Sequence, residues 1–173
     1  MPAKRINKAS RPTPLRGTHS AGHPPPEADE GWVGSDTPAR KVVSAPPKEF
    51  LKALVADDNA AMRRLVADYL ELLGFEVVAL AANGEAAVEL FKERSPGLVI
   101  MDVKMPKMTG IEAAREISKV ASVPIILLTG HSSEEVAHDA IEAGVFGYLV
   151  KPVTKKHLLP AIMLAIARFE QFR

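Results

Sequence analysis

Three acidic side chains follow two short apolar runs of the sequence. Asp57 and Asp58 come directly after the run Leu51–Ala56, and Asp102 ends the run Leu98–Met101. Carboxylates that lie close together repel one another unless a cation sits among them. Oxygen donors without His or Cys favour Mg²⁺, which also takes waters and a phosphate. The three acids therefore predict a Mg²⁺ site if the fold brings the two runs together.

Two further polar side chains end later apolar runs. Thr129 closes the run Ile125–Thr129, and Lys151 follows the run Phe146–Val150. Taken singly, such a Thr is usually a helix cap and such a Lys is usually a solvated loop charge. Together with the acids they predict a phosphoryl site, in which a carboxylate attacks while the metal, the ammonium and the hydroxyl neutralise the phosphoryl oxygens.

The elements that must position these residues alternate along the chain. Five short apolar runs are separated by segments with apolar residues at helical spacing, which predicts five strands that are each followed by a helix. The predicted strands are Leu51–Ala56, Phe75–Leu80, Leu98–Met101, Ile125–Thr129 and Phe146–Val150. This succession predicts an α/β, flavodoxin-like fold: a doubly wound parallel sheet of order 2-1-3-4-5 with helices on both faces. That order places the ends of the first and third strands side by side, at the edge where such sheets bind ligands.

Capping residues mark the predicted helices. The start signals are Asn83, Thr109 and Ser132 or Ser133, and the stop signals are Gly74 and Gly144. The last helix is predicted from about Thr154 toward Phe169. Pro160 lies inside it and removes a backbone donor, so we expect a late helix start or a kink.

Composition separates residues 1–48 from residues 49–173. The first segment holds nine of the 14 prolines and has eight Lys or Arg against four Asp or Glu, so it is predicted to be a disordered basic tail. The second segment is long enough to form one folded domain. The chain has no cysteine, which excludes disulfides and thiolate metal sites. It also lacks a run of about 18 apolar residues, so we expect a cytoplasmic protein without a membrane partner.

Five short motifs resemble the receiver domain of two-component response regulators, in the order of that family. They are Asp57-Asp58, Met101-Asp102, Met105-Pro106-Lys107-Met108-Thr109-Gly110, Thr129-Gly130, and Tyr148 through Lys151-Pro152. The resemblance covers about Lys52 to Phe169. It implies that Asp102 accepts a phosphoryl group from a sensor histidine kinase, a phosphotransfer protein or a small phosphodonor.

The same resemblance implies a set of Mg²⁺ ligands. Asp58 would bind the metal directly, and Asp57 would bind it largely through water. Asp102 and the backbone carbonyl of Lys104 would complete the protein ligands.

The resemblance also implies a switch. Thr129 and Lys151 would hold the phosphoryl oxygens, and the Thr129 hydroxyl would move toward the phosphoryl group while Tyr148 turns inward. These movements would reshape the face formed by the fourth helix, the fifth strand and the last helix. We expect a downstream protein, which the sequence does not identify, to bind this face, and a homodimer could form through it.

A phosphatase that uses Asp102 as its nucleophile is an alternative reaction. Phosphatases of the haloacid-dehalogenase type need an Asp two residues after the nucleophile as general acid, and that position is Lys104 here. We therefore expect a stoichiometric phosphoacceptor rather than an enzyme, with Mg²⁺-dependent self-phosphorylation and autodephosphorylation at most.

The end of the sequence leaves other outputs open. Residues from Lys151 to Phe169 are similar to the end of receivers in antitermination regulators of the AmiR/NasR kind, which continue into a coiled coil and a small helical RNA-binding domain. This chain stops four residues after Phe169. A remnant or partial RNA-binding regulator and a phosphate-sink interaction module are the alternatives to a signalling receiver. Because the basic tail lacks interleaved aromatic residues, we do not expect a nucleic-acid partner.

Overall fold

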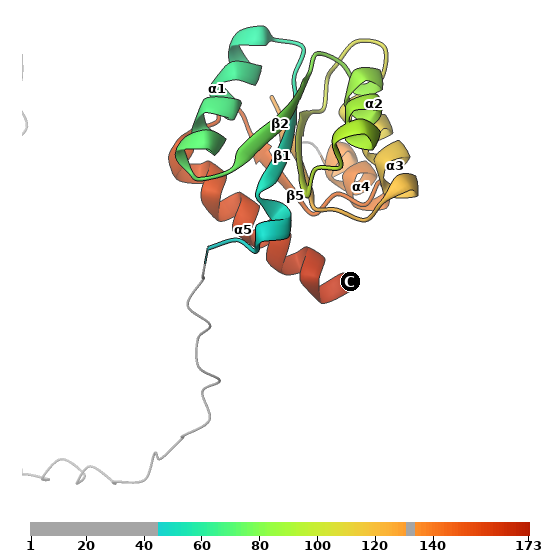
Figure 1. The fold of residues 1–173 in the computed structure, drawn as a ribbon. Coiled ribbons are helices and arrows are strands. Elements are labelled where there is room, and N and C mark those ends of the chain that lie inside the picture. The colour runs from blue at the N-terminus through green and yellow to red at the C-terminus, as the bar shows by residue number, and fades with distance from the viewer. Residues whose placement is uncertain (1–44, 131–133) are drawn as a thin grey trace, which may run out of the picture. The chain divides into compact units, whose positions relative to one another are not determined.

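The computed structural model describes residues 45–130 and 134–173 (Figure 1). In that part of the chain, five parallel strands form one sheet of order β2-β1-β3-β4-β5, as the sequence predicts. The strands are β1 (Lys52–Ala56), β2 (Glu76–Ala81), β3 (Leu98–Asp102), β4 (Ile125–Thr129) and β5 (Gly147–Val150). The helices are the 3-10 helix η1 (Lys48–Phe50), α1 (Ala60–Leu72), α2 (Gly84–Arg94), α3 (Gly110–Val120), α4 (Glu134–Glu142) and α5 (Lys155–Phe172).

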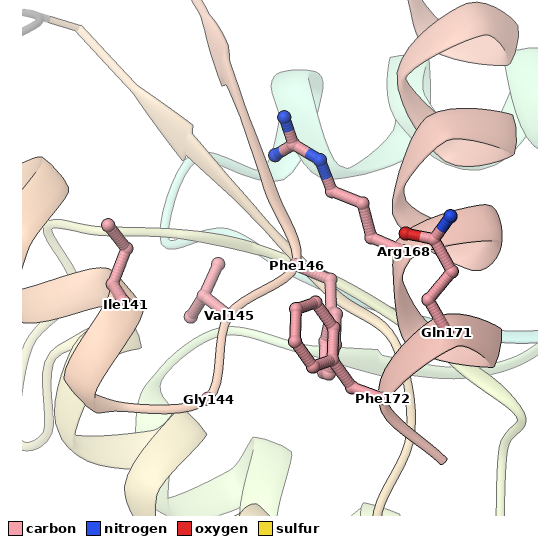
Figure 2. A pocket seen from close by; sticks show the side chains of 7 residues that line it. All are labelled: Ile141, Gly144, Val145, Phe146, Arg168, Gln171 and Phe172. Carbon is pink, nitrogen blue, oxygen red and sulfur yellow. The ribbon is translucent and has the colours of Figure 1, made fainter.

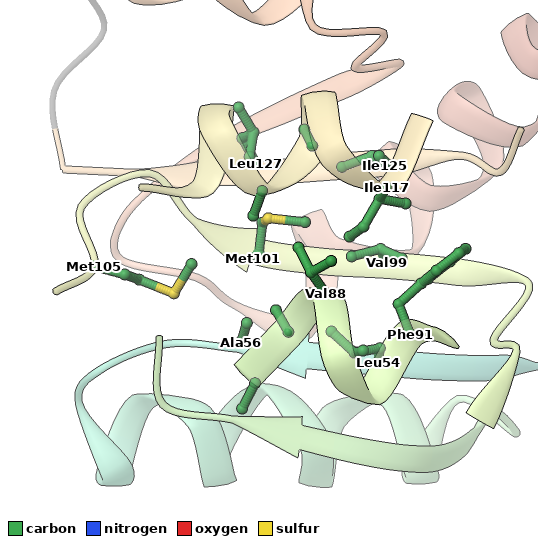
Figure 3. Close-up of a cluster of buried hydrophobic side chains, with 14 of the residues drawn as sticks. Leu54, Ala56, Val88, Phe91, Val99, Met101, Met105, Ile117, Ile125 and Leu127 are labelled. Carbon is green, nitrogen blue, oxygen red and sulfur yellow. The ribbon is translucent and has the colours of Figure 1, made fainter. Parts of the chain in front are cut away.

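Helices cover both faces of the sheet. Figure 1 shows α1 and α5 on one side and α2, α3 and α4 on the other. Alternate strand residues enter two separate cores: Leu54 and Val99 pack beneath α2 and α3 (Figure 3), whereas Val55 and Ile100 pack beneath α1 and α5. Burial on both faces explains why the strands read as continuous apolar runs.

The predicted cap residues begin and end the helices. The Asn83 side chain accepts a hydrogen bond from the Ala86 N–H at the start of α2. Thr109 and Glu112 form a reciprocal capping box at the start of α3. Gly74, with φ of 90°, follows α1 in the left-handed conformation that glycine adopts readily. Local chemistry therefore sets these boundaries.

Two predictions lie outside the described residues. Ser132 or Ser133 was predicted to cap α4, and neither residue is described. Residues 1–44, which make up almost all of the predicted tail, are also not described. Both predictions therefore stay predictions.

Of the two expectations for Pro160, the late helix start is wrong, and the kink stays a prediction. α5 begins at Lys155 and continues through Pro160 to Phe172. A proline inside a helix costs about 3 kcal/mol, but each large apolar side chain that this helix buries contributes about 1.5–3 kcal/mol. Packing therefore outweighs the missing backbone donor. The buried residues of α5 are Leu158, Ile162, Ala165, Ile166 and Phe169.

An aromatic cluster lies at the amino edge of the sheet, where the strands begin. The ring of Phe169 meets Phe50 and Phe146 edge to face, at centroid distances of 5.8 and 5.2 Å. The guanidinium of Arg173 lies 5.5 Å from the Phe169 centroid and donates a 2.7 Å hydrogen bond to Glu49. These five residues, named here the amino-edge cluster, tie η1 to the end of α5.

None of the helices in the described ranges is both long and apolar enough to cross a membrane.

Candidate functional site

The sheet order brings the three predicted acids together. Ala56 pairs with Met101 across β1 and β3, so the residues that follow them share one edge of the sheet. Asp57 is fully buried, Asp102 is 6% exposed and Asp58 is exposed. One carboxylate oxygen from each acid lies within 4.8 Å of the others. The acids therefore form the cluster that the sequence predicts.

Lys151 reaches into this cluster from the end of β5. Its ammonium Nζ lies 2.9 Å from Oδ2 of Asp57 and 3.2 Å from Oδ2 of Asp102. The Lys151–Pro152 peptide bond is cis. One cation thus bridges two buried carboxylates that come from different strands.

The hydrogen bonds of Asp57 and Asp58 differ. Both carboxylate oxygens of Asp57 are engaged, because Oδ1 accepts from the Asn59 backbone N–H at 2.9 Å and Oδ2 accepts from Lys151. Asp58 has no hydrogen-bond or ion-pair partner among the described residues. Asp58 can therefore offer both of its oxygens to a cation.

Burial and the ion pair shift the pKa values in this cluster. Desolvation raises the pKa of Asp102, helped by the charge of Asp57 and opposed by the hydrogen bond and charge of Lys151. Desolvation alone would lower the pKa of Lys151, but its hydrogen bonds to Asp57 and Asp102 outweigh that effect and raise it. Lys151 is therefore an ammonium at neutral pH, while Asp102 ionises less readily than an exposed Asp.

A glycine holds the backbone next to Asp102. The Gly110 N–H donates a 2.9 Å hydrogen bond to the Val103 carbonyl, which brings the start of α3 against the end of β3. A Cβ atom at residue 110 would overlap the backbone carbonyl of Asp102. Glycine is required here because the two backbones approach so closely.

The other predicted residues occupy distinct places. Thr129 is buried at the end of β4, one residue after Leu128, which pairs with Asp102. Tyr148 lies on β5 with 54% of its surface exposed, so its ring is outside the core. The Lys104 backbone lowers the pKa of Asp102, against the larger effect of burial, while the metal-binding role of its carbonyl stays a prediction.

The sequence reasoning missed two residues of the site. Asn59 caps α1, since its side chain accepts from the Met62 N–H at 3.0 Å, and the capping rule could have identified it. Arg63 donates a 2.6 Å hydrogen bond from Nη1 to the backbone carbonyl of Asp57. No sequence pattern marks that contact, because it depends on where α1 packs.

A pocket of about 520 Å³ lies apart from the acids, between the ends of α4 and α5 (Figure 2). Its walls include Ile141, Val145, Phe146 and Phe172, and Arg168 supplies a charge. Phe172 is 82% exposed. The pocket therefore combines apolar walls with one exposed aromatic ring and one cation, and it contains none of the three acids.

Comparison with known sequences identifies close relatives. The model of the response regulator receiver domain matches residues 53–163. The transcriptional regulatory protein PdtaR of Mycobacterium tuberculosis is 44% identical over 120 residues, which cover 69% of this chain and 58% of that protein. The chemotaxis protein CheY of Bacillus subtilis is 45% identical over 112 residues, which cover 64% of this chain and 93% of that protein. The chain thus spans less than two thirds of PdtaR and nearly all of CheY.

Solved structures share the fold. A response regulator receiver domain protein from Clostridium thermocellum superposes with a TM-score of 0.63 at 38% identity, covering 70% of this chain and 98% of its own. A chain of the CheX-CheY-BeF3-Mg²⁺ complex from Borrelia burgdorferi superposes with a TM-score of 0.63 at 26% identity, covering 65% of this chain and 86% of its own. These matches agree with the observed sheet order.

Proposed function

The chain belongs to the response regulator receiver domain family, and on this premise we propose that it accepts a phosphoryl group on Asp102 and signals as part of a two-component system. The observation that carries the proposal is the position of Asp102. It is buried at the carboxyl edge of the sheet, within 4.8 Å of two other carboxylates and 3.2 Å from the Lys151 ammonium. A phosphoryl group on Asp102 would therefore lie beside the Lys151 ammonium and beside carboxylates that can hold a cation.

The acidic cluster fits Mg²⁺, which receiver domains generally bind through acidic residues. All three donors are carboxylates that lie close together, and Asp58 has no partner among the described residues. Asp58 and Asp102 would bind the metal directly, with the Lys104 carbonyl. Asp57 would bind largely through water, because both of its oxygens already accept hydrogen bonds. When bound, Mg²⁺ neutralises charge on the acids and on the phosphoryl oxygens.

The proposed reaction transfers a phosphoryl group to Asp102. A carboxylate oxygen of Asp102 forms a bond to phosphorus, and the bond from phosphorus to the donor nitrogen of a histidine kinase or phosphotransfer protein breaks. The donor nitrogen keeps the electron pair. Lys151 and the Thr129 hydroxyl would each donate a hydrogen bond to a phosphoryl oxygen. Each protein molecule accepts one group, so the protein acts as a stoichiometric phosphoacceptor and not as an enzyme.

The proposed output surface is the α4–β5–α5 face. Four exposed apolar side chains support it, because such a surface gains stability when a partner covers it. They are Ile141, Tyr148, Val150 and Leu164. In the proposed switch, the Thr129 hydroxyl at the end of β4 moves toward the phosphoryl group. Tyr148, now exposed, would turn inward. A downstream protein or a second copy would bind this face.

One experiment tests both the chemistry and the output. Wild type and Asp102→Asn are incubated with acetyl phosphate and Mg²⁺, and intact mass and amide exchange are measured. We expect wild type alone to gain the mass of one phosphoryl group and to change exchange across the α4–β5–α5 face. Asp68→Asn is the matched control, since this acid lies on α1 and pairs with Arg64, and it should behave as wild type. An equal mass gain in wild type and Asp102→Asn would overturn the assignment.

A further inference from the structure

Arg63 contacts the loop that presents the acids. It lies in the second turn of α1, and its side chain is half-buried. Its Nη1 donates a 2.6 Å hydrogen bond to the backbone carbonyl of Asp57. This carbonyl belongs to the peptide unit that joins Asp57 to Asp58. Because a peptide unit is planar, fixing its oxygen also fixes the direction in which the chain enters Asp58.

Asp58 depends on its backbone for its position. The Asp57 carboxylate is held by Asn59 and Lys151, and the Asn59 side chain is held by the first turn of α1. The Asp58 carboxylate has no such partner within the described ranges. Its distance from the other acids is therefore set by the loop backbone, to which Arg63 is hydrogen-bonded.

The charge of Arg63 opposes the role that its geometry supports. A cation near the start of a helix is disfavoured by the helix dipole. A guanidinium beside an acidic cluster also repels a second cation that approaches the cluster. If Arg63 acted only through its charge, removing it would strengthen Mg²⁺ binding. If it acts by holding the loop, removing it would weaken Mg²⁺ binding.

We infer that Arg63 is a positioning residue, which holds the Asp57–Asp58 peptide so that Asp58 is presented to Mg²⁺. This inference rests on the proposed function of the acidic cluster. Arg63 does not touch the metal or the phosphoryl group, and it acts through the loop. Its neighbour Arg64 offers a matched control, because it is exposed and pairs with Asp68 at 2.8 Å on the outer surface of α1.

Isothermal titration calorimetry with Mg²⁺ on the full chain tests the inference. We expect Arg63→Ala to weaken Mg²⁺ binding about tenfold, the lower end of the effect of residues that orient metal ligands. Arg64→Ala should bind as wild type does. Arg63→Lys should recover part of the affinity, because it can still donate to the Asp57 carbonyl. Unchanged or stronger binding by Arg63→Ala would overturn the inference.

Two further measurements separate the causes of failure. Urea unfolding shows whether Arg63→Ala is folded, and Arg63→Gln replaces it in the titration if it is not. Asp58→Asn should lose Mg²⁺ binding even with Arg63 intact, because it removes a proposed direct ligand. If wild type itself binds no Mg²⁺, the proposed function fails. If Asp58→Asn weakens binding while Arg63→Ala binds as wild type, the proposed function stands and only the role of Arg63 is wrong.

Discussion

The two edges of the sheet carry ion pairs of opposite character. At the carboxyl edge, Lys151 bridges Asp57 and Asp102, and both acids are buried. At the amino edge, Arg173 pairs with Glu49 on the surface, with its guanidinium over aromatic rings. Both pairs join segments far apart in the sequence, but only the first removes charge from water.

The pKa directions show what this difference means. Burial raises the pKa of Asp102, so the fold disfavours the ionised form that the proposed reaction needs. The hydrogen bond from Arg173 lowers the pKa of Glu49, so the fold favours its ionised form. At the carboxyl edge, the negative charge of Asp102 therefore destabilises the fold unless a cation compensates it. At the amino edge, the negative charge of Glu49 stabilises the domain. Variants at the amino edge should therefore lower the free energy of unfolding without changing Mg²⁺ affinity, whereas removing the charge of Asp102 at the carboxyl edge should raise that free energy.

The largest expected effect on stability is at the amino edge. Phe169→Ala removes the ring that meets both Phe50 and Phe146. We expect a loss of about 3–5 kcal/mol in the free energy of unfolding, measured in urea. Mg²⁺ affinity of the folded protein should not change, because the acids lie at the opposite edge.

An aromatic residue on the same helix provides the control for this variant. Phe172 is 82% exposed, so Phe172→Ala should change the free energy of unfolding by less than about 0.5 kcal/mol. A loss of Mg²⁺ affinity in folded Phe169→Ala would contradict the separation of the two edges.

A smaller effect, of opposite sign, is expected at the carboxyl edge. Asp102→Asn mimics the neutral form that the fold favours, and Lys151 keeps its 2.9 Å contact with Asp57. In the absence of Mg²⁺ at pH 7, we expect this variant to be more stable than wild type in urea, by less than Phe169→Ala loses, because the amide lacks the charge that burial disfavours.

The pH dependence gives the sign of this effect independently. The pKa of Asp102 is raised in the folded state, so ionisation of Asp102 destabilises folded wild type. This loss of stability is absent below the unfolded pKa and is acquired as pH rises through the folded pKa. The advantage of Asp102→Asn should therefore shrink from pH 7 toward acid. A variant less stable than wild type at pH 7 would show that the charge of Asp102 stabilises the fold.

Sequence reasoning predicted the carboxyl edge far better than the amino edge. Asp102, Thr129 and Lys151 end apolar runs, and a parallel sheet necessarily gathers the ends of its strands at one edge. The Glu49–Arg173 pair joins residues 124 positions apart through long side chains, and no local pattern encodes it. The contact of Arg63 with the Asp57 carbonyl depends in the same way on how α1 packs.

Two elements show where local rules were insufficient. Pro160 predicts a late helix start or a kink, but the helix already begins at Lys155 because its buried face packs against the sheet. The motif around Tyr148 implies a switch residue, but it does not predict whether the ring is buried or exposed. Its place on β5, the last strand of the sheet, leaves that ring at the surface. Topology therefore decides features that neighbouring residues do not.

The smallest expected effect tests the surface pair of the amino edge. Glu49→Gln removes the charge that Arg173 contacts, while the guanidinium stays 5.5 Å from the Phe169 ring centroid through cation–π attraction. We expect the thermal midpoint at pH 7 to fall slightly, and by less than in Phe169→Ala, because exposed ion pairs contribute little. The lowered pKa of Glu49 means that its contribution is present above the unfolded value of 4.5 and is lost as pH falls through the folded pKa. Wild type and Glu49→Gln should therefore converge in acid, and a difference that persists below the folded pKa would show that the pair acts through packing and not through charge.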